Sequence, residues 1–132
     1  MKIDKILKGI EIISLTGTKN PVISGIVFDS RKVTCGSLFI AVKGYKTDGH
    51  DFVSSAITSG ASAVLCETLP ENTDKDICWI KTPDSAKALG LAASNFFGNP
   101  SSSLKLVGVT GTNGKTTIAT LLYKMFLSLG YK

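Results

Sequence analysis

The sequence contains few of the residues that would assign it to several common classes of protein. Its only arginine is Arg31, although lysine and arginine together number 15 against 10 aspartate and glutamate residues. Nucleic-acid-binding domains usually gather arginines and aromatic residues on one face, whereas the lysines here are spread along the chain. The net charge of +5 therefore favours attraction of an anionic small molecule, and we expect no nucleic-acid partner.

Cysteine and histidine are scarce as well. Cys35, Cys66 and Cys78 form no CxxC pair and His50 is the single histidine, so the usual spacings of a zinc site are absent. Separated thiols are typical of a reducing compartment, and we expect a cytoplasmic protein. The sequence has no apolar run of about 18 residues and no signal-peptide core, so we expect no membrane partner. It gives no indication of an oligomeric state.

The residues that are present indicate a globular domain with a short extension. Hydrophobic residues make up 43% and charged residues 19% of the 132 residues, as in a protein with an apolar core. The one stretch that resembles a linker is GNPSSS, at residues 98–103. It predicts a first domain over residues 1–100 and the start of a second over residues 101–132.

Short apolar runs alternate with helical patterns before this linker. Strands are predicted at residues 23–30, 37–42, 62–66 and 77–80, and helices at residues 3–8, 48–61 and 82–98. Asp48 and Thr82 are the predicted N-caps of the second and third helices. The third helix should bury a stripe made of Ala86, Leu89, Ala93, Phe96 and Phe97. Strands that alternate with helices predict a three-layer α/β domain.

A glycine-rich turn follows the linker. Residues 104–109 predict a strand, residues 111–117 (GTNGKTT) a turn, and the apolar spacing of residues 118–129 a helix. Strand, glycine loop and helix in this order form the context of a phosphate-binding loop, because a helix start offers free N–H groups to an anion. The predicted ATP-binding residues are Gly111, Thr112, Asn113, Gly114, Lys115, Thr116 and Thr117.

Two side chains of this loop have predicted roles in chemistry. Lys115 should reach the β- and γ-phosphates and act as the catalytic cation, and the Thr116 hydroxyl should contact Mg²⁺ bound with ATP. The general motif G-x-x-x-x-G-K-[ST] has glycine where Val109 stands, so the loop is a variant. The alternative is an ordinary glycine turn before a helix with an exposed lysine.

The variant GVTGTNGKTT resembles the ATP loop of the Mur ligases, which build the peptide of the bacterial cell wall, and of relatives that ligate glutamate to folates. The upstream segment FDSRKVTCGSLFIAVKGYKTDGHDFVSSAITSGASAVL is similar to the uridine-binding N-terminal domain of the later ligases of this family. The resemblance implies a UDP-sugar-binding domain with a mixed sheet, followed by the first strand, loop and helix of a truncated P-loop ATPase domain. The loop and Asp-Ser-Arg are more similar to the ligases that add the third amino acid than to those that add D-alanyl-D-alanine, which remain an alternative.

The same resemblance implies an ATP-dependent amide ligase of peptidoglycan synthesis, and hence a part in cell shape and division. Its substrates would be ATP with Mg²⁺, UDP-MurNAc-L-Ala-D-Glu and an amino acid that this chain does not identify. The chain would be the front end of a longer enzyme and inactive by itself. A nucleotide-sugar-binding module without catalysis is the alternative from a different class.

By this resemblance, the UDP-sugar-binding residues are Phe28, Ser30, Tyr45, Lys46 and Thr47. Their chemistry fits, because Ser30 offers a hydroxyl, Tyr45 a flat face for uracil and Lys46 a charge for the diphosphate. The alternatives are that Ser30 only caps its turn and that Tyr45 and Lys46 belong to a solvated loop.

Three neighbouring polar residues have structural predictions. Asp29 and Arg31 should hold their turn through an ion pair, without touching the substrate. His50 should lie at a helix start and take no part in catalysis.

Overall fold

The computed structural model describes residues 1–44 and 47–131. These residues form two compact units, Met1–Ser102 and Ser103–Lys132, and each unit is described here by itself. The first unit contains all five strands of the described chain. The division after Ser102 falls within residues 98–103, the stretch that the sequence marks as a linker.

The five strands form one mixed sheet in the order β1-β5-β4-β3-β2. Their bounds are β1 (Ser14–Gly17), β2 (Gly25–Val27), β3 (Ser37–Ile40), β4 (Ala63–Cys66) and β5 (Cys78–Lys81). Strands β2 to β5 run parallel to one another, and β1 pairs antiparallel with β5 at one edge. The predicted α/β architecture with a mixed sheet is therefore confirmed.

Helices lie against both faces of this sheet. The helical elements of the first unit are α1 (Ile3–Ile6), η1 (Ser30–Lys32), η2 (Gly49–Phe52), α2 (Val53–Thr58) and α3 (Ser85–Phe96), where η marks a 3-10 turn. Further along the chain come η3 (Pro100–Ser103) and α4 (Lys115–Ser128), which are not part of these layers. No helix in the described part of the chain is long and apolar enough to span a membrane.

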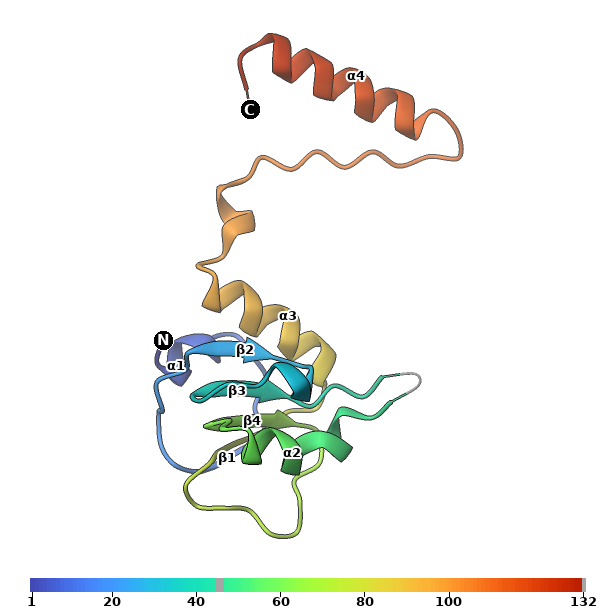
Figure 1. Cartoon of the computed structure of the whole chain (residues 1–132). Helices are drawn as coiled ribbons and strands as arrows, with labels where there is room; N and C mark the ends of the chain where they lie inside the picture. Colours follow the sequence, from blue (N-terminus) through green and yellow to red (C-terminus); the bar gives the residue numbers. More distant parts are fainter. Residues whose placement is uncertain (45–46, 132) are drawn as a thin grey trace. The chain divides into compact units, whose positions relative to one another are not determined.

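The core consists of two apolar clusters separated by the sheet. Because side chains alternate along a strand, Leu38 and Ile40 of β3 point to α1 and α3, while Phe39 points to the face of α2. The central strands β3 and β4 are buried along their whole length, which explains their unbroken apolar sequence. Figure 1 shows the resulting layers, with α3 on one side of the sheet and α2 on the other.

The start of α3 differs from the prediction. The N-cap is Asp84, whose carboxylate accepts a hydrogen bond from the Lys87 N–H at 2.8 Å. The predicted cap Thr82 is buried, and its hydroxyl donates to the Glu11 carbonyl at 2.9 Å, so it is not available to the helix.

The buried face of α3 also differs from the prediction. The helix buries Ser85, Ala88 and Ala92, with Leu89 and Phe96 partly covered. Ala86 is exposed and Phe97 is 71% exposed, so the predicted stripe was wrong at these two positions. The second helix also divides into the turn η2 and the short helix α2, with Asp48 capping the turn as predicted.

In the second unit, the predicted strand over residues 104–109 is not formed. A strand is stabilised by hydrogen bonds to a neighbour, and no other described segment of this unit is extended alongside it. The helix predicted after the glycine turn is present as α4.

Candidate functional site

A hollow of about 550 Å³ opens at the carboxyl ends of β2 and β3. Residues 28–31, which directly follow β2, line one side. The other side is lined by five residues that follow β3, which are Val42, Gly44, Thr47, Gly49 and Phe52. Ligands of open α/β sheets bind at the carboxyl ends of parallel strands, so this hollow is the candidate binding site of the first unit.

The turn after β2 is held by the predicted ion pair. The Asp29 carboxylate accepts hydrogen bonds from the backbone N–H of Arg31 at 3.1 Å and from its guanidinium at 2.9 and 2.8 Å. The side-chain hydrogen bonds from Arg31 are the main reason that the pKa of Asp29 falls to about 2. The prediction that these two residues hold the turn is confirmed.

Ser30 lies between these two charges with its hydroxyl unused. Asp29 supplies the side-chain cap of η1, and the Ser30 hydroxyl makes no hydrogen bond with any described residue. The adjacent Phe28 is 65% exposed and also lines the hollow. The structure thus brings two of the predicted UDP-sugar residues together, as an open hydroxyl beside an exposed aromatic ring.

The chain after β3 folds back on itself and brings Thr47 to the hollow. The Gly44 N–H donates to the Thr47 carbonyl at 3.1 Å, and Lys43 pairs with Asp48 in an isolated antiparallel bridge. Thr47 lines the hollow as a third predicted residue. Tyr45 and Lys46 lie outside the described residues, so their contacts with the substrate stay predictions.

Gly49 is a lining residue that the sequence reasoning missed. Its N–H donates to the Val42 carbonyl at 2.9 Å. A Cβ atom at position 49 would lie 2.7 Å from the nitrogen and 2.8 Å from the oxygen of Val42, which are backbone atoms that cannot turn aside. Only glycine therefore fits at this contact, and the Asp-Gly pair after a strand was its one signal in the sequence.

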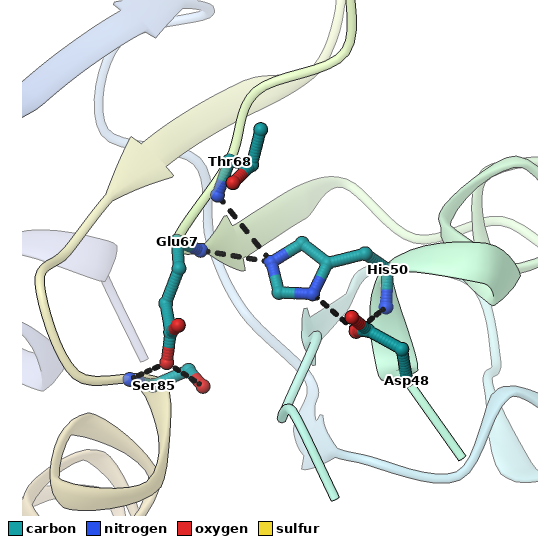
Figure 2. Close-up of polar contacts among 5 residues, drawn as sticks. All are labelled: Asp48, His50, Glu67, Thr68 and Ser85. Carbon is teal, nitrogen blue, oxygen red and sulfur yellow. Dashed lines mark hydrogen bonds and ion pairs between the residues drawn. The ribbon is translucent and has the colours of Figure 1, made fainter.

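A cluster of hydrogen bonds next to Gly49 in the sequence joins η2 to the end of β4 and the start of α3 (Figure 2). Nδ1 of His50 lies 2.5 Å from Oδ1 of Asp48, and its Nε2 accepts from the N–H groups of Glu67 at 3.0 Å and Thr68 at 3.4 Å. Glu67 Oε1 accepts from the N–H of Ser85 at 2.9 Å and from its hydroxyl at 2.7 Å. His50 lies at the start of a helical turn, as predicted, but its long-range contacts were missed.

The two carboxylates of this cluster are stabilised in their charged form. Hydrogen bonds from the backbone N–H and ring of His50 lower the pKa of Asp48. Hydrogen bonds from the N–H and hydroxyl of Ser85 lower the pKa of Glu67. Both side chains therefore remain hydrogen-bond acceptors at neutral pH.

The second unit presents the predicted glycine loop at the start of α4. Gly111 and Gly114 have φ angles of +146° and +75°, which favour glycine. Gly114 is the N-cap and no side chain caps the helix, so the N–H groups of the first turn have no side-chain partner. These donors, which include those of Thr116 and Thr117, fit an anion such as a phosphate.

Lys115 lies over this loop. Its ammonium donates to the carbonyl oxygens of Gly111 and Thr112, the latter at 3.3 Å. Asn113 completes the turn between these residues and the helix. This arrangement holds the positive charge of Lys115 against the loop, whose backbone turns at Gly111 and Gly114.

The comparisons with known proteins agree with one another. The sequence model of the Mur ligase family, catalytic domain, matches residues 22–97. The UDP-N-acetylmuramoyl-L-alanyl-D-glutamate--2,6-diaminopimelate ligases of Phocaeicola vulgatus and Clostridium tetani are 52% and 44% identical to this chain over its whole length. The chain spans 27% and 28% of the length of these two relatives.

Two solved structures extend the likeness to the fold. A structure of a ligase with the same printed name is 29% identical, with a TM-score of 0.62, over 98% of this chain and 26% of that one. The MurF ligase of Thermotoga maritima, in complex with ADP, is 36% identical, with a TM-score of 0.57. That match covers 81% of this chain and 24% of the other.

Proposed function

The chain belongs to the Mur ligase family, and from that premise we propose that it binds the UDP-sugar substrate of an ATP-dependent amide ligase and begins its ATP site. The hollow at the ends of β2 and β3 is the observation that carries the proposal. It combines an exposed aromatic ring, an unengaged hydroxyl and curved backbone, which suit a nucleotide base and its sugar.

Within the hollow, we assign the uridine end of the substrate to the side formed by residues 28–30. The ring of Phe28 offers an apolar face, and the hydroxyl of Ser30 donates to or accepts from a polar edge. Thr47 contacts the ligand from the opposite side. The Arg31 guanidinium is paired with Asp29, and we propose Lys46, which precedes Thr47 in the sequence, as a further cation for the diphosphate.

The second unit is proposed to hold the phosphates of ATP. The free N–H groups at the start of α4 and the ammonium of Lys115 bind the anion and stabilise the charge that develops as the γ-phosphoryl group moves. The hydroxyl of Thr116 is proposed to orient a Mg²⁺ ion, which when bound would neutralise phosphate charge.

The proposed reaction forms an amide bond in two steps. A carboxylate oxygen of the D-glutamyl residue in UDP-MurNAc-L-Ala-D-Glu attacks the γ-phosphorus of ATP, and ADP leaves. The amine of the third amino acid then attacks the acyl phosphate carbonyl, the C–O bond breaks, and phosphate and a proton are released. We propose 2,6-diaminopimelate as this amino acid, since the curated relatives carry it in their printed names.

The test uses the longer ligase that contains this chain, with UDP-MurNAc-L-Ala-D-Glu, ATP and either 2,6-diaminopimelate or L-lysine. We expect ATP-dependent product with 2,6-diaminopimelate and little with L-lysine. Product with L-lysine alone would refute the assignment of the third amino acid and leave the ligase proposal standing.

Lys115→Ala in the same protein should lower turnover about a hundredfold or more, because a positive charge at the transferring phosphoryl group is lost. Lys124→Ala, an exposed lysine on the same helix, is the matched control and should keep its turnover. Unchanged turnover in Lys115→Ala would show that the loop is an ordinary glycine turn.

A further inference from the structure

His50 lies behind the wall of the hollow rather than in it. The wall is formed by Thr47, Gly49 and Phe52, which line the hollow on either side of His50 in sequence. The ring of His50 points instead to the end of β4 (Figure 2), and its side chain is only 18% exposed. His50 therefore connects the wall to the sheet without reaching a ligand.

The partners of the ring determine which protonation state fits. Two backbone N–H groups, of Glu67 and Thr68, donate to Nε2, so this nitrogen must carry a lone pair. Nδ1 then carries the proton and donates it to the Asp48 carboxylate. Only the neutral ring with its proton on Nδ1 satisfies all three partners.

We propose that His50 is a positioning residue that fixes the wall of the hollow to β4 while its ring is neutral and releases it when the ring is protonated. The proposal rests on the proposed function, since the expected consequence is weaker binding of the UDP-sugar in mildly acidic solution. A protonated Nε2 would present a hydrogen atom to two N–H groups, which cannot accept it.

The charges around the ring decide which contact breaks. Asp48 on the side of η2 and Glu67 at the end of β4 are carboxylates, and both stabilise a protonated ring. Lys43 lies near Asp48 and Asp84 near Glu67, where they act on these carboxylates. Asp48 would therefore keep hold of the protonated ring, and the bonds from the two N–H groups of the β4 end would be lost.

The ring and its partners can be observed directly in the 132-residue chain, because it has a single histidine. Nitrogen NMR at about pH 7.5 should show Nδ1 protonated and Nε2 unprotonated. The hydrogen-exchange protection factors of the Glu67 and Thr68 amides should fall as the ring takes up its second proton. The amide of Ser62, which donates to the Ser37 carbonyl at the other end of β4, is the control and should keep its protection. A protonated Nε2 at about pH 7.5, or unchanged protection of both amides, would overturn the proposal.

The effect on the hollow is measured by calorimetric titration with UDP-MurNAc-L-Ala-D-Glu at about pH 7.5 and about pH 5.5. The native chain should bind about five- to thirtyfold more weakly at the lower pH, as expected for the loss of one or two hydrogen bonds of about 1 kcal/mol each. His50→Gln places a carboxamide oxygen near the same N–H groups and takes up no proton, so it should recover part of the affinity with little pH dependence. His50→Leu should bind weakly at both values.

Two results distinguish a failure of the His50 proposal from a failure of the proposed function. Equal affinity and equal pH dependence in His50→Leu and the native chain would contradict the role of His50. A native chain with no affinity at either pH would contradict the proposed function, while the NMR result on the ring would still decide the contact with β4. The amide spectra of both variants show whether the first unit remains folded.

Discussion

At the rim of the hollow, the ion pair of Asp29 and Arg31 stabilises the backbone turn, while Ser30 between them is the residue proposed to bind the ligand. The Asp29 carboxylate accepts from the N–H and the guanidinium of Arg31, so this pair fixes the backbone of the turn. Ser30 between them keeps an unengaged hydroxyl. The outer residues of Asp-Ser-Arg therefore hold the turn, and the middle residue is left to bind.

The pKa of Asp29 tests whether Arg31 stabilises the carboxylate of this turn. Because the folded value of about 2 lies below the ordinary 3.8, the carboxylate stabilises the turn above about pH 4 and ceases to do so as the pH falls through about 2. In Arg31→Met, the pKa should rise toward 3.8 but not reach it, since the backbone N–H of residue 31 still donates. Lys32→Met is the control and should raise the pKa of Asp29 only slightly, because Lys32 has the smallest effect on it. Carbon NMR of the carboxyl group measures all three, and an Arg31→Met value near 2 would contradict the account.

Local sequence predicted the Asp29–Arg31 pair but not the contacts of His50. Opposite charges two residues apart across a turn meet without help from the rest of the fold. The partners of the His50 ring come from Glu67 and Thr68, which are 17 and 18 residues away. Only the parallel pairing of β3 and β4 brings these segments together, and no local pattern encodes it.

Elements with two covered faces were the easiest to predict. β3 and β4 form unbroken apolar runs because helices cover both sides of the sheet. The edge strand β1 has one half-buried and three exposed residues, so it shows no burial pattern and was missed. Residues 104–109 have a strand-like sequence, but without a neighbour to pair with they form no strand.

The close approach of η2 to the end of β3 depends on Gly49. In Gly49→Ala, the added methyl group would meet the backbone of Val42, and relieving the clash should cost about 1–3 kcal/mol of unfolding free energy. Gly25→Ala in β2 is the matched control, because a Cβ atom there meets nothing within 4 Å. Urea denaturation of both variants measures the difference. A Gly49→Ala variant as stable as Gly25→Ala would show that the wall of the hollow adjusts freely.

At the scale of the whole molecule, the chain has one complete core. Both apolar clusters lie within the first unit, from Ile3 to Ala92, and cover the two faces of its sheet. Among the described residues of the second unit, α4 has no strand or second α-helix to pack against. We therefore expect binding of the UDP-sugar to be a property of the first unit.

The order of the elements from β2 to α3 could be predicted from sequence, because each has its own apolar pattern, whereas β1 was missed and the strand predicted at residues 104–109 is not formed. The complete lining of the hollow could not be predicted, because it brings residues that follow β2 together with residues that follow β3. Their meeting depends on the register Gly25↔Ser37 to Val27↔Phe39, which is set by packing on both faces of the sheet.

The hollow beside Ser30 is proposed to bind the uridine end of a UDP-sugar. Calorimetric titration of the 132-residue chain with UDP-MurNAc-L-Ala-D-Glu at neutral pH tests it most directly, using the native chain, Ser30→Ala and the exposed control Ser54→Ala on α2. We expect saturable binding that weakens about fivefold in Ser30→Ala, through a lost hydrogen bond of about 1 kcal/mol, and is unchanged in the control. Equal affinity in Ser30→Ala and the native chain, or no binding by the native chain, would contradict the claim.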